Sequence, residues 1–211
     1  MKSHCWLRPL ALACLAAIGG AGSLGPFESN ADVGAGLEKG KVESSGPGKY
    51  RVTGGGADMW GKADAFHFVW KKMSGNMTLT ADVLLTGASA QEKRKAALMV
   101  RQSLDPGSPY ADIAFHGNGE VAAQWRFAAG EATGDAVLPH FLDTTVPQRI
   151  RIARHGNTFT AMAGEPGGQL APMAPFTVNL TDPVYVGLAV CSHDANALTT
   201  AAFTNVKLEP R

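Results

Sequence analysis

The sequence predicts an all-β domain built as an antiparallel two-sheet β-sandwich. Its closing stretch, residues 184–206, reads as a strand, a short polar turn and a second strand, with many β-branched residues. Turn residues at 117–119 (Gly-Asn-Gly) and 155–157 (His-Gly-Asn) indicate two further hairpins. No stretch of useful length has helical periodicity. Because a single open sheet would leave many edges unpaired and one apolar face bare, two packed sheets are expected.

The other strands follow one another along the chain with turn residues between them. A strand at 50–53 ends at Gly54-Gly55-Gly56, which we interpret as a turn or bulge rather than a phosphate-binding loop. Further strands are expected at 65–72, 77–85, 95–103, 110–116, 120–127, 149–154, 158–163, 176–180, 185–192 and 201–208.

The N-terminus has the layout of a secretory signal peptide, which favours a secreted or periplasmic protein. Lys2 and Arg8 form a short basic start, which is followed by an apolar run at 10–18 and by small residues at 19–23. The apolar run is too short to span a bilayer; the alternative is a buried N-terminal helix. A lipid anchor at Cys14 is disfavoured, because the residues before it match a lipobox poorly. The expected organisation is a signal peptide at 1–22, an N-terminal lead with room for one short strand at 23–48, and the sandwich domain at 49–211.

Charge and cysteine content narrow the class of protein. The chain has 19 basic and 18 acidic residues, so removal of Lys2 and Arg8 with the signal peptide leaves 17 and 18, a net charge near −1. Such a balance gives no reason to expect binding to nucleic acid or anionic lipid. Removal also leaves Cys191 as the one cysteine, which we interpret as a packed, inert thiol rather than a nucleophile activated by His193.

Alternation of side chains along a strand assigns each residue to one of two faces. The core face is predicted to hold Phe66, Phe68, Trp70, Leu98, Val100, Ile113, Phe115, Val121, Ala123, Trp125, Phe127, Val184, Val186, Leu188 and Val190. The opposite face then carries polar and aromatic groups, among them Asp112 and Tyr185.

Seven residues of that opposite face are candidate ligand-binding residues: His67, Arg101, Tyr110, His116, Gln124, Arg126 and His193. Most carry planar or bidentate hydrogen-bonding groups, which match sugar hydroxyls. Tyr110 and Trp60 are candidate rings for the C–H face of a sugar. The alternative is an ordinary solvated sheet face with scattered polar residues.

Several long motifs resemble one bacterial family. GGGADMWG at 54–61, DAFHFVWKK at 64–72, RKAALMVRQSLDPGSPYADIAFHGNG at 94–119, DPVYVGLAVCSHD at 182–194 and AFTNV at 202–206 are similar to the DUF1349-like group of exported concanavalin A-like lectin/glucanase domains. The resemblance covers residues 27–207. It implies a jelly roll with one concave sheet face, on which lectins and glucanases of that fold hold carbohydrate.

The resemblance and the residues together favour a noncatalytic carbohydrate- or glycan-binding module. Glucanases of this fold carry E-x-D-x-x-E on one strand, and the chain has no Glu-x-Asp. Two alternatives stay open: a sugar hydrolase or lyase that uses His and Arg on the same face, and a module that docks an exported protein partner. No cofactor is expected. Four aspartates in or near loops have two interpretations, as calcium ligands or as ordinary turn residues: Asp105, Asp112, Asp182 and Asp194.

Overall fold

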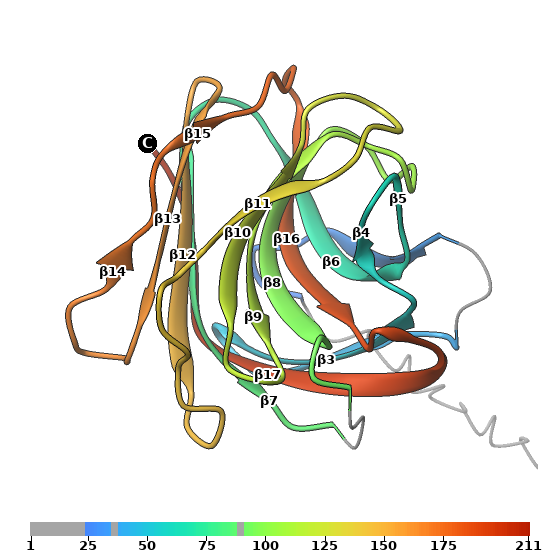
Figure 1. Ribbon diagram of the computed structural model, residues 1–211, viewed down its shortest axis with the longest axis vertical. Helices are drawn as coiled ribbons and strands as arrows, with labels where there is room; N and C mark the ends of the chain where they lie inside the picture. The colour runs from blue at the N-terminus through green and yellow to red at the C-terminus, as the bar shows by residue number, and fades with distance from the viewer. Residues whose placement is uncertain (1–23, 35–37, 88–90) are drawn as a thin grey trace, which may run out of the picture.

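A computed structural model describes residues 24–34, 38–87 and 91–211, and shows two antiparallel sheets packed face to face (Figure 1). The predicted signal peptide at 1–22, with Cys14, lies outside the described residues. The described residues form strands and no helix, so none of them forms a helix that could cross a membrane. The all-β sandwich predicted from the sequence is confirmed.

The first sheet has seven strands and carries most of the predicted ligand-binding residues. In spatial order these are β1 (Ser29–Val33), β6 (Phe66–Met73), β16 (Val184–Cys191), β8 (Lys95–Arg101), β9 (Tyr110–His116), β10 (Val121–Arg126) and β11 (Gly134–Val137). We call the side of this sheet that is turned away from the second sheet the outer face.

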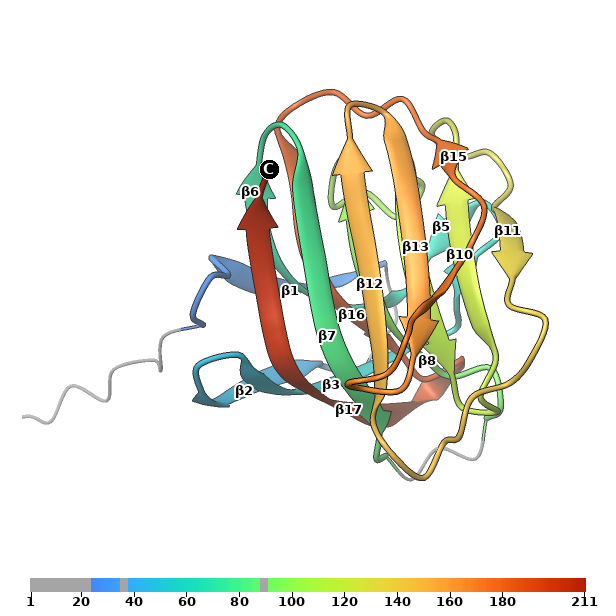
Figure 2. The ribbon, with the colours of Figure 1, turned by 90° about the vertical axis from the view of Figure 1, so that its left-hand side faces the viewer.

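The second sheet has eight strands and faces the viewer in Figure 2. In spatial order these are β14 (Ala171–Pro172), β13 (Thr158–Gly164), β12 (Gln148–His155), β7 (Met77–Leu85), β17 (Asp194–Pro210), β3 (Lys49–Gly56) and β2 (Lys41–Gly46), with β15 (Phe176–Thr177) paired to β13.

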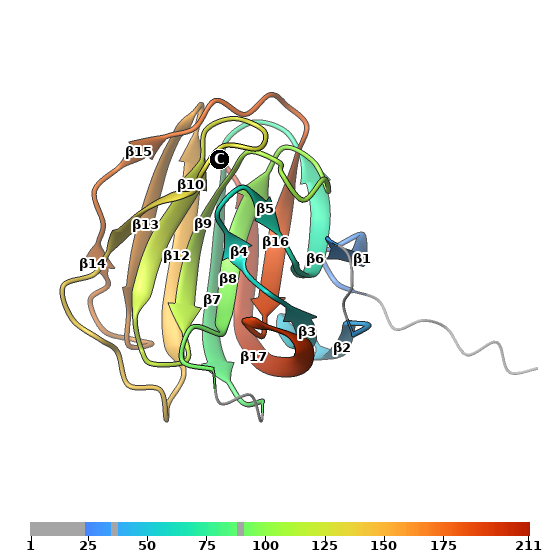
Figure 3. The same ribbon diagram turned by 45° about the vertical axis from the view of Figure 1, so that its right-hand side comes forward.

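A small hairpin lies over the outer face of the seven-stranded sheet (Figure 3). It consists of β4 (Met59–Trp60) and β5 (Ala63–Asp64) and is closed by a hydrogen bond from the Ala65 amide to the Asp58 carbonyl, 2.7 Å long. We call residues 58–65 the roof hairpin. Its position decides which parts of the outer face reach solvent.

The main core lies between the two sheets, where alternate residues of each strand are buried. On β8, β9, β10 and β16 the predicted core residues join this cluster, with Trp125 packed partly exposed at its margin. The predicted faces of these four strands are therefore correct. Phe127 was expected in the core, but it lies just beyond the end of β10 and is 56% exposed.

The predicted faces of β6 are reversed. Phe66 and Phe68 belong to a second apolar cluster on the outer face, under the roof hairpin, whereas His67 lies between the sheets and is 1% exposed. Trp70, also expected in the core, packs against the outer cluster. The strand alternates two apolar sets, and the larger rings occupy the side that the roof hairpin covers.

The two sheets approach each other closely beside His67, which faces inward on β6. Gly54 is part of β3, which runs on through Gly56 instead of ending at residue 53 as predicted. A Cβ atom on Gly54 would collide with the Val190 carbonyl and lie 2.8 Å from the His67 Cβ. The glycine therefore permits the backbone of β3 to approach the Val190 carbonyl of β16 and the His67 side chain of β6 closely.

The segment expected as an N-terminal lead supplies an edge strand to each sheet. β1 pairs with β6, and β2 pairs with β3. The His67 imidazole helps to hold β1, because its Nδ1 lies 2.7 Å from Asp32 Oδ1. Residues 29–33 and 41–46 are thus part of the sandwich rather than a separate extension.

Candidate functional site

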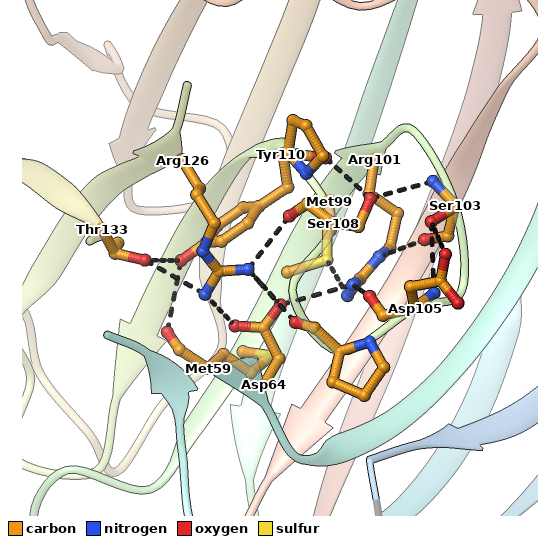
Figure 4. A network of polar contacts seen from close by, with 12 residues as sticks. Met59, Asp64, Met99, Arg101, Ser103, Asp105, Ser108, Tyr110, Arg126 and Thr133 are labelled. Atoms are coloured by element: carbon orange, nitrogen blue, oxygen red, sulfur yellow. Dashed lines mark hydrogen bonds and ion pairs between the residues drawn. The ribbon is translucent and has the colours of Figure 1, made fainter. Parts of the chain in front are cut away.

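Arg126 projects from the outer face as its position in the strand predicts, but the roof hairpin buries it completely. Its guanidinium forms a bidentate pair with Asp64 of the hairpin, with Nη2–Oδ1 and Nη1–Oδ2 distances of 2.6 and 2.9 Å (Figure 4). The same group donates to the Ser108 and Glu131 carbonyls at 3.0 and 3.1 Å. Arg126 was expected in an exposed groove, and this position is a correction.

Arg101 and Tyr110 share this buried network and are also fully covered. Arg101 Nη2 lies 3.3 Å from Asp64 Oδ2, so one carboxylate faces two guanidiniums. The Tyr110 hydroxyl donates to the Met59 carbonyl at 3.3 Å, and the Arg126 guanidinium lies 5.0 Å from the centre of its ring. These side chains hold the roof hairpin against the sheet.

Burial and the attraction between opposite charges shift the pKa values of this network in opposite directions. Burial raises the pKa of Asp64, and the hydrogen bond from Arg126 and the charge of Arg101 oppose that shift. Burial likewise lowers the pKa of Arg101, against the attraction of Asp64. Because its charged groups are fully buried and paired with one another, this network has a structural role. Arg101, Tyr110 and Arg126 are therefore not accessible to a ligand.

Beside the roof hairpin the outer face opens into a cavity of about 220 Å³. We call it the side cavity. Strands β8 to β11, the turn after β16 and one edge of the hairpin supply its walls. Its lining residues are Asp58, Trp60, Lys93, Lys95, His116, Glu120, Gln124, Asp135 and His193.

Ion pairs fix the charged groups at the rim and floor of the side cavity. Lys95 is 3% exposed and its Nζ lies 2.8 Å from Asp58 Oδ1, which ties the sheet to the hairpin. Lys93 Nζ lies 2.8 Å from Glu120 Oε1. Within the described part of the chain the Asp135 carboxylate forms no ion pair or hydrogen bond, and Asp135 is the register partner of Gln124 in the β10–β11 pair. The cavity thus has positioned acceptors without a large net charge.

His116 and Gln124 form the neutral part of the lining. Burial lowers the pKa of His116 to about 4, with the charge of Lys95 adding to the shift, so the imidazole is neutral at pH 7. Its Nδ1 lies 3.2 Å from the Glu120 carbonyl oxygen. The Oε1 atom of Gln124 is buried and has no hydrogen-bond partner in the described structure. An imidazole and a side-chain amide are groups that exchange hydrogen bonds with hydroxyls.

Trp60 forms the aromatic edge of the side cavity. It lies on β4 at the rim of the roof hairpin and is 37% exposed. An indole ring that is partly open to solvent can pack against the C–H face of a small polar molecule. The arrangement therefore combines one apolar wall with hydrogen-bonding groups on the sheet.

The structure brings together three of the seven predicted ligand-binding residues. His116, Gln124 and His193 line the side cavity, together with Trp60, which the sequence nominated as a ring. The other four are covered: Arg101, Tyr110 and Arg126 lie under the roof hairpin, and His67 lies between the sheets.

Sequence reasoning missed five lining residues. Lys95 could have been found, because it shares a face of its strand with Arg101. Asp58 and Asp135 lie on a short hairpin and on a four-residue strand that leave no clear alternation. Glu120 could also have been found, because it has the parity of Gln124 and Arg126 in the strand predicted at 120–127. Lys93 precedes its strand, where alternation assigns no face.

The aspartates considered as calcium ligands and the Cys191 thiol lie outside the side cavity. Within residues 24–34, 38–87 and 91–211, no group of three or more His, Cys, Asp or Glu could hold a metal ion. Of the aspartates considered for calcium, Asp112 is fully buried on β9 and Asp182 pairs with Arg154. Burial raises the pKa of the Cys191 thiol to about 12, so it is protonated at pH 7.

Comparisons with known proteins bear on the fold. No protein-family model matches the sequence, and no curated protein matches it. Similar solved structures include a functionally unknown protein from Saccharomyces cerevisiae, with TM-score 0.65, 13% identity, and coverage of 81% of this chain and 92% of that one.

Two other similar structures carry names that refer to carbohydrate. The carbohydrate binding module CBM66 from Bacillus subtilis has TM-score 0.57 and 13% identity, over 88% of this chain and 98% of that one. The β-glucanase from Bacillus licheniformis has TM-score 0.56 and 12% identity, over 89% and 97%. The chain therefore has the jelly-roll fold of the concanavalin A-like lectins and glucanases.

Proposed function

We propose that this protein is an exported, noncatalytic module that binds carbohydrate in the side cavity. The observation that carries the proposal is that the partly exposed Trp60 ring and the Gln124 side chain, whose Oε1 atom has no hydrogen-bond partner in the described structure, line the same small cavity. Sugars present a C–H face and a ring of hydroxyls, and these two groups meet each of them. The fold supports the proposal, since a carbohydrate binding module and a glucanase share it.

Export and family membership belong to the same proposal. The basic start and apolar run at the N-terminus support a signal peptide at 1–22, and hence a secreted or periplasmic protein. The motifs between residues 54 and 206 support a place in the DUF1349-like group.

A glycan array followed by calorimetry on each hit tests the proposal. We expect Trp60→Ala to weaken binding about tenfold, or about 1.4 kcal/mol, because the apolar wall is lost. Gln124→Ala should cost about 0.5–1.5 kcal/mol, the value of one hydrogen bond. Phe141→Ala is the matched control, because this ring is 65% exposed and does not line the side cavity.

Three results would contradict the proposal. A silent array would favour a protein partner instead. A loss of binding in Phe141→Ala as large as that in Trp60→Ala would show that the sugar does not bind specifically in the side cavity. Release of reducing sugar from a bound oligosaccharide by the purified protein would show that the module is catalytic, and His116 would then be the first residue to replace.

A further inference from the structure

We propose that the side cavity receives the end of a glycan chain and rejects its interior. The inference rests on the proposed function and adds the class of ligand: a terminal sugar unit, with the rest of the chain leading away into solvent. It follows from the way in which the roof hairpin closes the outer face of the sheet.

The hairpin blocks the path across the strands. A row of alanines crosses the outer face on β16, β8 and β9, because Ala189, Ala97 and Ala114 are paired in register. Met59 of the roof hairpin is fully buried in the same apolar cluster as these alanines. The methionine therefore occupies the space that the small side chains leave open, and Asp58 and Trp60 beside it become a wall of the cavity.

Loops cover the outer face next to the cavity, at the end of β10 where Arg126 lies. The Thr133 amide donates to the Gly61 carbonyl at 3.0 Å, and the Gly130 amide donates to the Gly107 carbonyl at 2.9 Å. Arg126 lies beneath these contacts and donates to the Gly61 carbonyl at 3.2 Å. A chain lying along β10 would meet this closed end.

The size of the cavity agrees with a single unit. Its volume of about 220 Å³ is below the roughly 300–1,000 Å³ of pockets that enclose drug-sized ligands. A groove that accommodates the interior of a polysaccharide needs two open ends, and the contacts above close one end and one side.

The test is the dependence of affinity on chain length. Malto-, cello-, laminari-, xylo- and inulo-oligosaccharides of two to six units are titrated into the full chain by calorimetry. Terminal recognition predicts that Kd per molecule changes less than about fivefold from two units to six. A rise in affinity of fivefold or more with length would overturn the inference and leave carbohydrate binding intact.

Stoichiometry on a long linear polysaccharide of the binding series gives a second arm. Terminal recognition predicts that bound protein scales with the number of chain ends, so longer fractions bind less protein per unit mass. Binding in proportion to mass, irrespective of chain length, would overturn the inference. If no series binds, both the proposed function and this inference fail. That outcome differs from failure of terminal recognition alone, in which a series binds but its affinity rises with chain length. Trp60→Ala should weaken every length by the same factor.

Discussion

The role of Arg126 gives the sharpest prediction for stability. Arg126→Met keeps an unbranched side chain of similar length and removes the guanidinium from its buried position under the roof hairpin. Asp64 would retain one cationic neighbour, Arg101, at 3.3 Å. The Gly61 carbonyl would retain the Thr133 amide.

The expected cost follows from the groups left without partners. The carbonyl of the buried residue Ser108 would lose the only donor that the described structure gives it. The Glu131 carbonyl would also lose Arg126, but it belongs to an exposed residue and water can replace the donor. Each unsatisfied buried acceptor costs about 1–3 kcal/mol. Breaking a buried ion pair by removing one partner typically costs about 3–5 kcal/mol. We therefore expect Arg126→Met to lower the free energy of unfolding by about 3–5 kcal/mol, a large part of the roughly 5–15 kcal/mol of a domain.

Urea unfolding followed by tryptophan fluorescence measures this change. Arg51→Met is the matched control, because Arg51 is exposed on β3, and a surface change of this kind stays within about 0.5 kcal/mol. A loss below about 1 kcal/mol for Arg126→Met at unchanged m-value would refute the reasoning, since the network would then contribute little to the fold.

Three further predictions concern single sites. The pKa of His116 is about 4 in the folded chain and 6.5 in the unfolded one. The unfolded chain therefore binds more protons between these pH values, and the free energy of unfolding falls by up to about 3 kcal/mol as the pH drops from 6.5 to 4. Urea titrations at the two pH values should show a smaller fall for His116→Gln. Gly54→Ala should destabilise by about 1–3 kcal/mol in the same assay, because its Cβ would collide with the Val190 carbonyl; an unchanged midpoint would show that the sheets can separate there. Cys191 should resist iodoacetamide at pH 8 until urea unfolds the chain, because burial keeps its thiol protonated; mass spectrometry of its peptide would show native labelling if that is wrong.

The sequence was sufficient for the sandwich and for the faces of four strands. On β8, β9, β10 and β16 one set of alternate residues is aliphatic or aromatic and the other contains charged or small residues, so the alternation has one solution. On β6 the alternation is Phe66-His67-Phe68, and the rings were assigned to the core between the sheets. They lie under the roof hairpin instead, because both faces of this strand are covered.

The site could be predicted only in part because its cover is remote in sequence. Arg126 faces outward from β10, as alternation requires, yet Asp64 reaches it from a hairpin 62 residues earlier in the chain. Strands as short as Met59–Trp60 carry no readable period. For the same reason Asp135 on β11 went unseen, whereas Gln124 and His116 on long strands were found.

Nuclear magnetic resonance would show directly which residues a sugar contacts. An oligosaccharide that binds on the array is titrated into ¹⁵N-labelled protein, and the indole and side-chain amide signals are followed. Binding in the side cavity should shift the signals of the Trp60 indole and the Gln124 side-chain amide, and leave the Trp125 indole, on the opposite face of β10, unmoved. Shifts that spare Trp60 and Gln124 and concentrate on another surface would contradict it.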